Sequence, residues 1–429
     1  MPTNLTASFS GRRVPIRRSR AAAPLLAPSA PANAYAARQL VDPALAEPVA
    51  RAYHYLDVVH DAYQRGGEPR LLQSYNDESE LSTTAFVYDN ALAMLAWLAS
   101  PTIANVRRVR LVGDALLRAL AQDDGRLRQA YAADGRAAAL DGFGFGGSST
   151  GDTAWAGIAL AQLYIDTRIG KYLDGAVALG RWIGRQESPY HYGGYHGGVR
   201  SDGETPQRWA STEHNLDAYA LFELLAKLTK GREWERRAER AAAFVRAMWN
   251  RRGRHFWTGT LGGLPDEDPN VVNTANVPED AQSWAVLALR DPRFDGAVDW
   301  VTRSLRTTDA DISGVSYSSF CRPAGLAPAS ALPHVDGAVW LEGTAHTALA
   351  LLERGDSELA RRLLFALTRA QETLGAGQTI GGRPLPAASG LVAATNAFDT
   401  GFEYGHFPRQ HVGTTAWFLM AAQHFNPFE

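Results

Sequence analysis

The sequence contains a single cysteine, Cys321, in 429 residues. One cysteine cannot form an intrachain disulfide, and it excludes a structural zinc site built from several thiolates. Lysine is also scarce, because Lys171, Lys227 and Lys230 are the only three and arginine supplies nearly all of the positive charge. Because there is only one cysteine, the sequence gives no information about the redox compartment.

Long apolar runs and blocks of like charge are missing as well. No stretch approaches the roughly 18–20 apolar residues that a transmembrane helix needs. The formal net charge is -2, and charge of one sign clusters only near the N-terminus. Nucleic-acid binding requires a clustered basic face, so this class of function is excluded. The hydrophobic fraction of 45% is sufficient for a large buried core.

The N-terminal segment has an ambiguous composition. A basic stretch over residues 12–18 precedes apolar residues 21–26 and a run of small residues that ends near Ala36. This order is typical of an export signal, but Pro24 and Pro28 interrupt the apolar part. We predict a disordered tail over residues 1–38, with an export signal as the alternative. A cytoplasmic location is favoured slightly over export to the periplasm or the exterior.

Six similar segments recur along the remainder of the chain. Each begins with polar or small residues and continues into an apolar stretch rich in alanine, leucine and aromatics. The segments are Tyr88–Trp97, Gly151–Leu160, Thr212–Leu221, Glu279–Ala288, Leu341–Ala350 and His411–Met420. Anchored on Asp89, Asp152, Glu213, Asp280, Glu342 and Gly413, they are spaced by 61 to 71 residues. This spacing fits a unit of two helices with two connections.

The two kinds of helix in each unit differ in polarity. The recurring segments are apolar on nearly every side, so each should be buried all round. The segments between them carry charge on one face and should form an outer layer: residues 45–65, 107–120, 173–185, 233–249, 297–305 and 357–371. Two such rings make an all-α (α/α)6 toroid of six helical hairpins. We therefore predict one catalytic domain over residues 39–429.

All six inner helices should begin at the same end of the barrel. Long connections with glycine, aromatic and polar residues lead into these starts, so this end should form a wide polar mouth. The predicted catalytic residues there are Glu213, Asp89 and Glu342. The predicted substrate-binding residues are Asp152, His214, Asn215, Tyr192, Tyr195, Trp257, Asp280, Gln282, His346, Tyr404, Arg409 and His411.

Each of these side chains also has a structural interpretation. Acids favour the first turn of a helix, because they accept hydrogen bonds from free N–H groups and face the positive end of the helix dipole. Asp89 and Asp152 could thus be N-caps, and the histidines could be buried core residues. The loop aromatics could be lids on the barrel end, or they could stack on sugar rings. Glu213 is the hardest acid to explain as a cap, because Ser211 and Thr212 already offer capping hydroxyls.

The sequence resembles a bacterial branch of the six-hairpin glycosidase-like superfamily. The resemblance covers about residues 45–428. It rests on the hairpin period, on the segments 212–217, 339–344 and 411–417, and on Asn426–Phe428. The superfamily includes glycoside hydrolases, polysaccharide lyases and sugar 2-epimerases, so the resemblance implies carbohydrate chemistry. It shares no single catalytic motif, and it transfers no catalytic residue to this chain.

The leading hypothesis is a glycoside hydrolase that acts on a bacterial poly- or oligosaccharide, with Glu213 as general acid and Asp89 or Glu342 as base. A lyase or epimerase would instead use histidine, tyrosine or arginine in the same site. A non-catalytic glycan-binding toroid is a third reading, and a terpene-cyclase-like enzyme is the least favoured. Dispersed acids and histidines show no metal-ligand spacing, so we predict no required metal and no cofactor. The oligomeric state is open.

Overall fold

The computed structural model describes residues 39–64, 66–77, 81, 83–133, 146–321, 337–402 and 404–429. The segment 1–38, predicted to be a tail or an export signal, lies outside these residues. The described residues from 39 onward form one compact unit. No helix in this part of the chain is long and apolar enough to cross a membrane.

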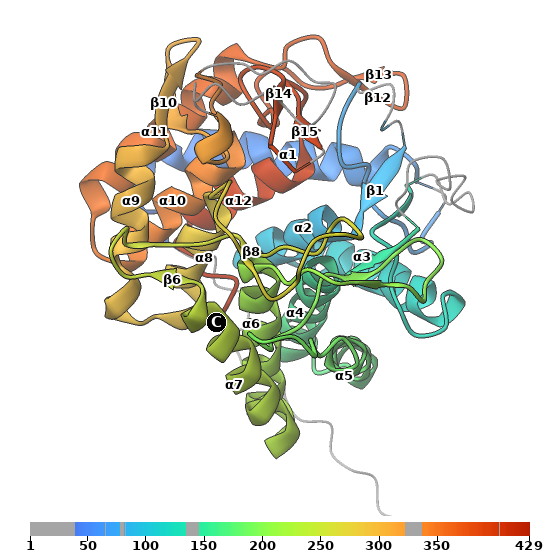
Figure 1. Cartoon of the computed structure of the whole chain (residues 1–429). Coiled ribbons are helices and arrows are strands. Elements are labelled where there is room, and N and C mark those ends of the chain that lie inside the picture. The colour runs from blue at the N-terminus through green and yellow to red at the C-terminus, as the bar shows by residue number, and fades with distance from the viewer. Residues whose placement is uncertain are drawn as a thin grey trace, which may run out of the picture. The chain divides into compact units, whose positions relative to one another are not determined.

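The described residues form twelve α-helices, which alternate between an inner and an outer ring (Figure 1). The inner helices are α2 (Val87–Ala99), α4 (Thr150–Thr167), α6 (Thr212–Thr229), α8 (Asp280–Leu289), α10 (Leu341–Glu353) and α12 (Val412–Ala422). The outer helices are α1 (Ala46–Asp61), α3 (Ile103–Gln122), α5 (Gly170–Gly184), α7 (Arg232–Ala247), α9 (Gly296–Ser304) and α11 (Ser357–Thr373). The all-α (α/α)6 toroid predicted from the sequence is confirmed.

The inner helices close into a ring. Each contacts the next, and α12 contacts α2 although the two lie at opposite ends of the described chain (Figure 1). In α2, α10 and α12 nearly every residue is buried, as expected for helices without a polar face. The outer helices bury one face, and in α7 the buried residues Trp234, Ala238, Ala241 and Val245 follow the helical period.

The two ends of the barrel differ in their connections. From inner to outer helix the chain needs only residues 100–102, 168–169, 230–231, 290–295 and 354–356. Helices α4, α6 and α8 end there on left-handed residues, Arg168, Lys230 and Arg290, with φ between 51° and 58°. Such C-caps satisfy terminal carbonyl groups and reverse the chain in little space. The long connections all lead into inner-helix starts, as predicted.

Every described strand lies in one of these long connections. Two-stranded antiparallel pairs form from β1 (Thr84–Phe86) with β2 (Ala130–Ala132), β6 (Trp249–Asn250) with β7 (His255–Phe256), β8 (Gly259–Thr260) with β9 (Val272–Asn273), β10 (Arg306–Asp309) with β11 (Ile312–Val315), β12 (Thr379–Ile380) with β13 (Arg383–Pro384), and β14 (Phe398–Asp399) with β15 (Gly405–His406). A three-stranded sheet contains β3 (Ser148–Ser149), β4 (Gly198–Val199) and β5 (Pro206–Gln207). Three short 3-10 helices complete the described elements: η1 (Pro43–Leu45), η3 (Pro292–Phe294) and η4 (Ser319–Cys321). The strands fix the loops that surround the mouth.

Candidate active site

The first turn of five of the inner helices holds its incoming loop through a recurring contact, which we call the loop clamp. In three helices the clamp is a side-chain amide: Asn90, Asn215 and Gln282. Each amide NH₂ donates to the carbonyl four residues earlier, and each amide also pairs with the N–H and the C=O of one loop residue. Tyr195 N–H, for example, donates to Asn215 Oδ1 over 2.9 Å. The amides thereby supply the hydrogen bonds that water cannot give to the buried backbone of the loops.

Two threonines perform part of the same function. The hydroxyls of Thr344 and Thr415 donate to the carbonyls of Trp340 and His411, four residues earlier. Each also accepts a loop N–H, from Val315 or Leu391. The clamp therefore supplies a structural register for comparing the repeats.

This register corrects the sequence alignment by one residue. Glu213, Asp280 and Glu342 each lie two residues before the clamp, as does Gly413 in the last repeat. Asp89 lies only one residue before its clamp. Asp152 also lies one residue before Thr153, whose hydroxyl donates to the carbonyl of Ser149 four residues earlier and which occupies the clamp position of α4. Neither aspartate is an N-cap, since α4 is capped by Ser149, whose Oγ accepts the Asp152 N–H.

A buried ion-pair network crosses the mouth from α2 to α8. His411 Nε2 lies 3.2 Å from the Asp89 carboxylate, and His411 Nδ1 lies 3.5 Å from Glu342 Oε2. The Tyr88 hydroxyl donates to Glu342 Oε1 over 2.7 Å and accepts the Trp417 indole N–H. Asp89, Glu342 and His411 are each less than 5% exposed. First and last repeats are thus joined through charged side chains.

The network continues through His346 to Glu279. His346 Nδ1 lies 3.1 Å from Glu279 Oε2, and the Thr347 hydroxyl donates to Glu279 Oε1. His346 Nε2 lies 3.7 Å from Glu342 Oε1, which is an ion-pair distance rather than a hydrogen bond. His346 and Glu279 are both fully buried. Two acids thus flank one imidazole.

These contacts set the charges of the network. Burial alone would lower the pKa of His346, but hydrogen bonds and charges from Glu279 and Glu342 raise that pKa to about 9. Burial alone would raise the pKa of Glu342, but His346, His411 and Tyr88 lower it to about 2. The pKa of His411 is raised by Asp89 and Glu342 against the effect of burial. At neutral pH the Glu342 carboxylate therefore faces a His346 imidazolium group.

On the α4–α6–α8 side the pKa values of the acids are raised, whereas that of Glu342 is lowered. Burial raises the pKa of Glu213 well above its ordinary range, and the charges of Asp280, Asp152 and Glu342 add to this effect. Burial also raises the pKa values of Asp152 and Asp280 to about 7, with contributions from Asp89 and from Glu279 respectively. The side chain of Glu213 keeps 30% of its surface exposed. The predicted acids therefore do converge at one end of the barrel.

Asp217 lies one helical turn after Glu213, on the same face of α6. It is fully buried, and neither carboxylate oxygen has a hydrogen-bond partner of good geometry among the described residues. Burial and the neighbouring charges of Glu213, Asp280 and Asp152 raise its pKa well above the ordinary range. Gly151 on α4 permits this arrangement, because a Cβ there would lie 3.2 Å from Asp217 Oδ2 and 2.6 Å from His214 Cδ2.

Aromatic rings fill the barrel axis. Trp155, Trp284 and Trp417 contact one another at centroid distances of 5.2 to 5.9 Å. His346 packs on Trp417 at 4.3 Å, and Tyr88 contacts Trp155 at 5.6 Å. Phe428, near the C-terminal end, packs against Trp155 and Trp284. These contacts place an indole layer directly against the acid and histidine groups.

Two aromatic side chains from the loops lie near the acids whose pKa values are raised. Tyr404 lies in the connection between β14 and β15 with an exposed side chain, and the charges of Asp280, Glu213 and Glu342 act on its hydroxyl. Its hydroxyl shares a 2.6 Å hydrogen bond with the Tyr317 hydroxyl. Trp209 packs on His214 at 5.2 Å and is half-buried. Burial lowers the pKa of His214 to about 4, so this imidazole is neutral at physiological pH.

Three residues predicted to bind substrate have structural roles. Asn215 and Gln282 are loop clamps, and their amide groups are occupied by backbone partners. Tyr195 is fully buried, packs on Phe222 and donates its hydroxyl to the Arg237 carbonyl. Backbone groups of the loops occupy the two amides, and the α7 backbone binds the Tyr195 hydroxyl, so a role of these three residues in substrate binding stays a prediction.

The remaining predicted binding residues lie in the loop walls. Tyr192 is half-buried against His191, and Trp257 packs on His255. Arg409 is half-buried in a segment whose backbone pairs with Ala393. The described contacts do not bring these three to the acids, so their role in binding stays a prediction.

Several site residues were missed at the sequence level. Tyr88 and Glu279 directly precede predicted acids, and Asp217 follows Glu213 by four residues, the spacing of neighbours on one helix face. That spacing was a usable signal for Asp217. No comparable signal exists for Trp209 and Tyr317, because their proximity to the acids depends on loop paths. Among the described residues no group of three or more histidine, cysteine or acidic side chains is arranged to hold a metal ion.

Comparisons with known proteins agree with this geometry at the level of the fold. No family model matches the sequence. No curated protein matches it either. A sugar epimerase from a ruminal bacterium aligns with a TM-score of 0.61 and 11% identity over 88% of this chain and 98% of that chain. Cellobiose 2-epimerase from Bacillus thermoamylovorans aligns with a TM-score of 0.59 and 11% identity, over 87% and 98% of the two chains.

An alpha-1,6-mannanase of family GH76 from a Salegentibacter species is also similar, with a TM-score of 0.54 and 13% identity over 89% of this chain and 99% of that chain. The chain is therefore a six-hairpin (α/α)6 toroid protein, as the sequence resemblance implied. At these identities the likeness is one of fold.

Proposed function

We propose that this protein is a carbohydrate-active enzyme, and specifically a glycoside hydrolase with Glu213 as its general acid. Hydrolysis of a glycosidic bond requires one protonated carboxyl group and one carboxylate near the scissile bond. The observation that carries the proposal is the raised pKa of Glu213, a partly exposed carboxyl group among three further acids. A carboxyl group with a raised pKa retains its proton to a higher pH than an ordinary glutamate and can transfer it to the leaving oxygen.

A position in the first helical turn would by itself lower the pKa of Glu213. Burial and the like charges of Asp152 and Asp280 outweigh this effect. We infer that Asp152 is the base that takes a proton from the attacking water, because it is half-buried and its pKa is about 7. Asp89 and Glu342, favoured as base on sequence grounds, are almost fully buried and are engaged by His411 and Tyr88.

A sugar epimerase is the second candidate. His214 is neutral at physiological pH, and its Nδ1 has no hydrogen-bond partner among the described residues. A neutral imidazole can remove a proton beside a carbonyl group. Two of the structural neighbours are sugar epimerases, so the fold supports both chemistries.

The test is a screen of bacterial poly- and oligosaccharides with the wild-type protein and Glu213→Gln. We expect release of reducing ends by the wild type, a loss of at least about 100-fold in Glu213→Gln, and retained glycan binding. The exposed Glu235→Gln on α7 serves as control. Hydrolysis by Glu213→Gln at near the wild-type rate would reject the assignment. Exchange of deuterium from D₂O into the sugar without bond cleavage would favour the epimerase.

A further inference from the structure

A cavity of about 580 Å³ lies outside the inner ring of helices. It is formed by the end of α7, the β6–β7 hairpin and η3. Its lining residues are Arg246, Trp249, Arg251, Arg254, Arg293 and Phe294. None of them belongs to an inner helix or to the acid and histidine groups at the mouth. The cavity is thus walled by four guanidinium groups and two aromatic rings.

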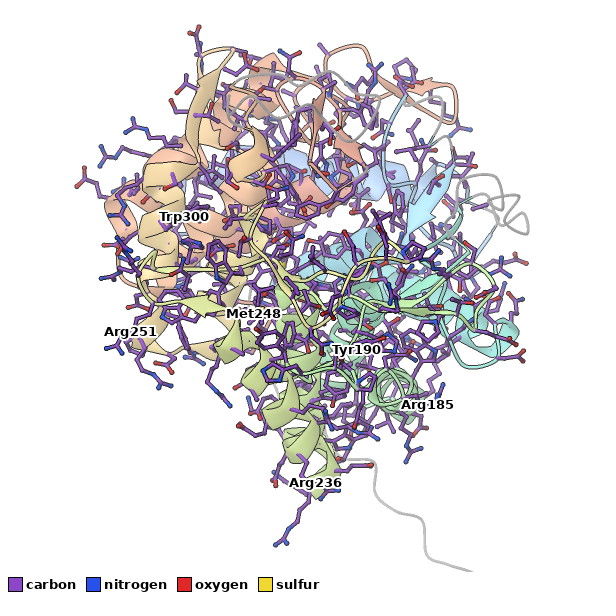
Figure 2. All side chains as sticks on the ribbon, viewed as in Figure 1. Arg185, Tyr190, Arg236, Met248, Arg251 and Trp300 are labelled. Carbon is purple, nitrogen blue, oxygen red and sulfur yellow. The ribbon has the colours of Figure 1, made fainter. Side chains whose placement is uncertain are left out.

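The positive charge of this wall is only partly compensated. Arg293 pairs with Asp291, and Arg246 pairs with Glu239. Arg254 lies 3.7 Å from Asp299, but Arg354 binds the same carboxylate at 2.8 Å. Arg251 is exposed and has no acidic partner among the described residues; Figure 2 labels it at the edge of the domain. Two guanidinium groups therefore remain available to an anion.

Local structure holds these groups in place. The hairpin turns over residues 251–254, where Arg254 N–H donates to the Asn250 carbonyl and the Arg254 φ is 56°. The Arg254 guanidinium lies directly on Gly296, where a Cβ would come within 2.3 Å of Arg254 Nε. Trp249 packs on Phe256 and Phe294 behind the arginines. The site therefore presents a fixed Arg254 guanidinium beside aromatic rings, with the exposed Arg251 on the same turn.

We propose that this cavity binds an acidic saccharide, with its carboxylate, sulfate or phosphate group on Arg251 and Arg254 and its ring against Trp249. A guanidinium binds planar oxyanions through two parallel hydrogen bonds, which a lysine cannot reproduce. The C–H-rich face of a sugar ring suits an indole surface. This site is separate from the hydrolytic one, so the two proposals can fail independently.

The test measures binding to the full-length protein by calorimetry and by tryptophan fluorescence. The probes are an oligogalacturonate, a sulfated oligosaccharide of equal length, a neutral oligosaccharide and inorganic phosphate. The variant is Arg251→Gln with Arg254→Asn, since asparagine tolerates the left-handed backbone at 254. Arg236→Gln, an exposed arginine of α7 labelled well away from Arg251 in Figure 2, is the matched control.

We expect an acidic oligosaccharide to bind and the double variant to weaken binding at least tenfold, with less than a twofold change in Arg236→Gln. A preference for the carboxylated or the sulfated probe identifies the anionic group. Equal binding of the neutral oligosaccharide, equal losses in both variants, or no binding of any acidic probe would overturn the proposal. Full competition by phosphate at equal concentration would leave an anion site without saccharide recognition, and would also overturn it.

Discussion

His411 lies against Asp89, with Nε2 3.2 Å from the carboxylate, and this contact joins the last inner helix to the first. The same imidazole faces Glu342 on α10. His411 therefore contributes both to the closure of the ring and to the charge of the site. A change at the mouth should consequently affect both stability and activity, and the following predictions separate the two effects.

Asp217→Asn should stabilise the protein more at high pH than at low pH. The folded-state pKa of Asp217 is raised, so ionisation is easier in the unfolded chain and the wild type loses stability as pH rises above 3.8. Asparagine has no such loss. We expect the difference in Tm between variant and wild type to grow by at least about 3 °C from pH 5 to pH 8. The exposed Asp174→Asn is the control, and a difference independent of pH would contradict the prediction.

His346→Asn should destabilise the protein, because it leaves the buried Glu279 and Glu342 without their shared cation. Loss of one partner from a buried ion pair costs about 3–5 kcal/mol. The folded-state pKa of His346 is raised to about 9, so its contribution is complete below pH 6.5 and disappears as pH rises through 9. Denaturant unfolding across this range checks the prediction, with the exposed His54→Asn as control.

The wild-type protein provides an independent check of the same assignment. The imidazole of His346 should remain protonated at pH 8 in an NMR titration, whereas that of His214 should be neutral above pH 5. A neutral His346 at pH 7 would refute the charge pattern of the network.

Gly413→Ala should impair activity while the fold persists. A Cβ at Gly413 would lie 2.5 Å from Asp89 Oδ1 and 3.1 Å from Glu342 Oε2, so both carboxylates must move. We expect kcat/KM to fall at least about tenfold, since small displacements of charged groups disturb an organised site. Gly170→Ala, at the open start of α5, has no neighbour within 4 Å and should retain full activity. Equal kinetics for the two variants would contradict the prediction.

Asn215→Ala should reduce stability without a specific effect on binding. The substitution removes three hydrogen bonds of 2.8 to 3.0 Å and leaves the buried Tyr195 backbone unpaired. Unpaired buried groups cost about 1–3 kcal/mol each, so we expect a loss of roughly 2–4 kcal/mol. Asn396→Ala, an exposed residue with one 3.5 Å contact, is the control. A large increase in KM at unchanged stability would restore Asn215 as a substrate ligand.

The fold was predictable because two of its signals can be read directly from the order of the residues. The spacing of the repeats and the absence of a polar face on alternate helices both follow from residue order alone, as α2 and α12 illustrate. The position of the acids at one end followed from the alternation of long and short connections. The proximity of the acids to one another was therefore a consequence of the fold prediction.

The assignment of roles was less predictable, because it depends on partners far away in sequence. Asn215 and Gln282 look like ligands beside acids, yet their amides are occupied by Tyr195 and Phe256. Asp89 and Glu213 look equivalent in sequence, yet they lie at different positions relative to the loop clamp. One is paired with His411 and the other lies among acids, and only the folded chain distinguishes these environments.

The indole layer of Trp155, Trp284 and Trp417, with Phe428 packed on it, blocks the axis below the charged groups. A polymer cannot be threaded through such a barrel. Any molecule that reaches Glu213 must arrive and depart through the same opening, so a product left inside would obstruct the next encounter.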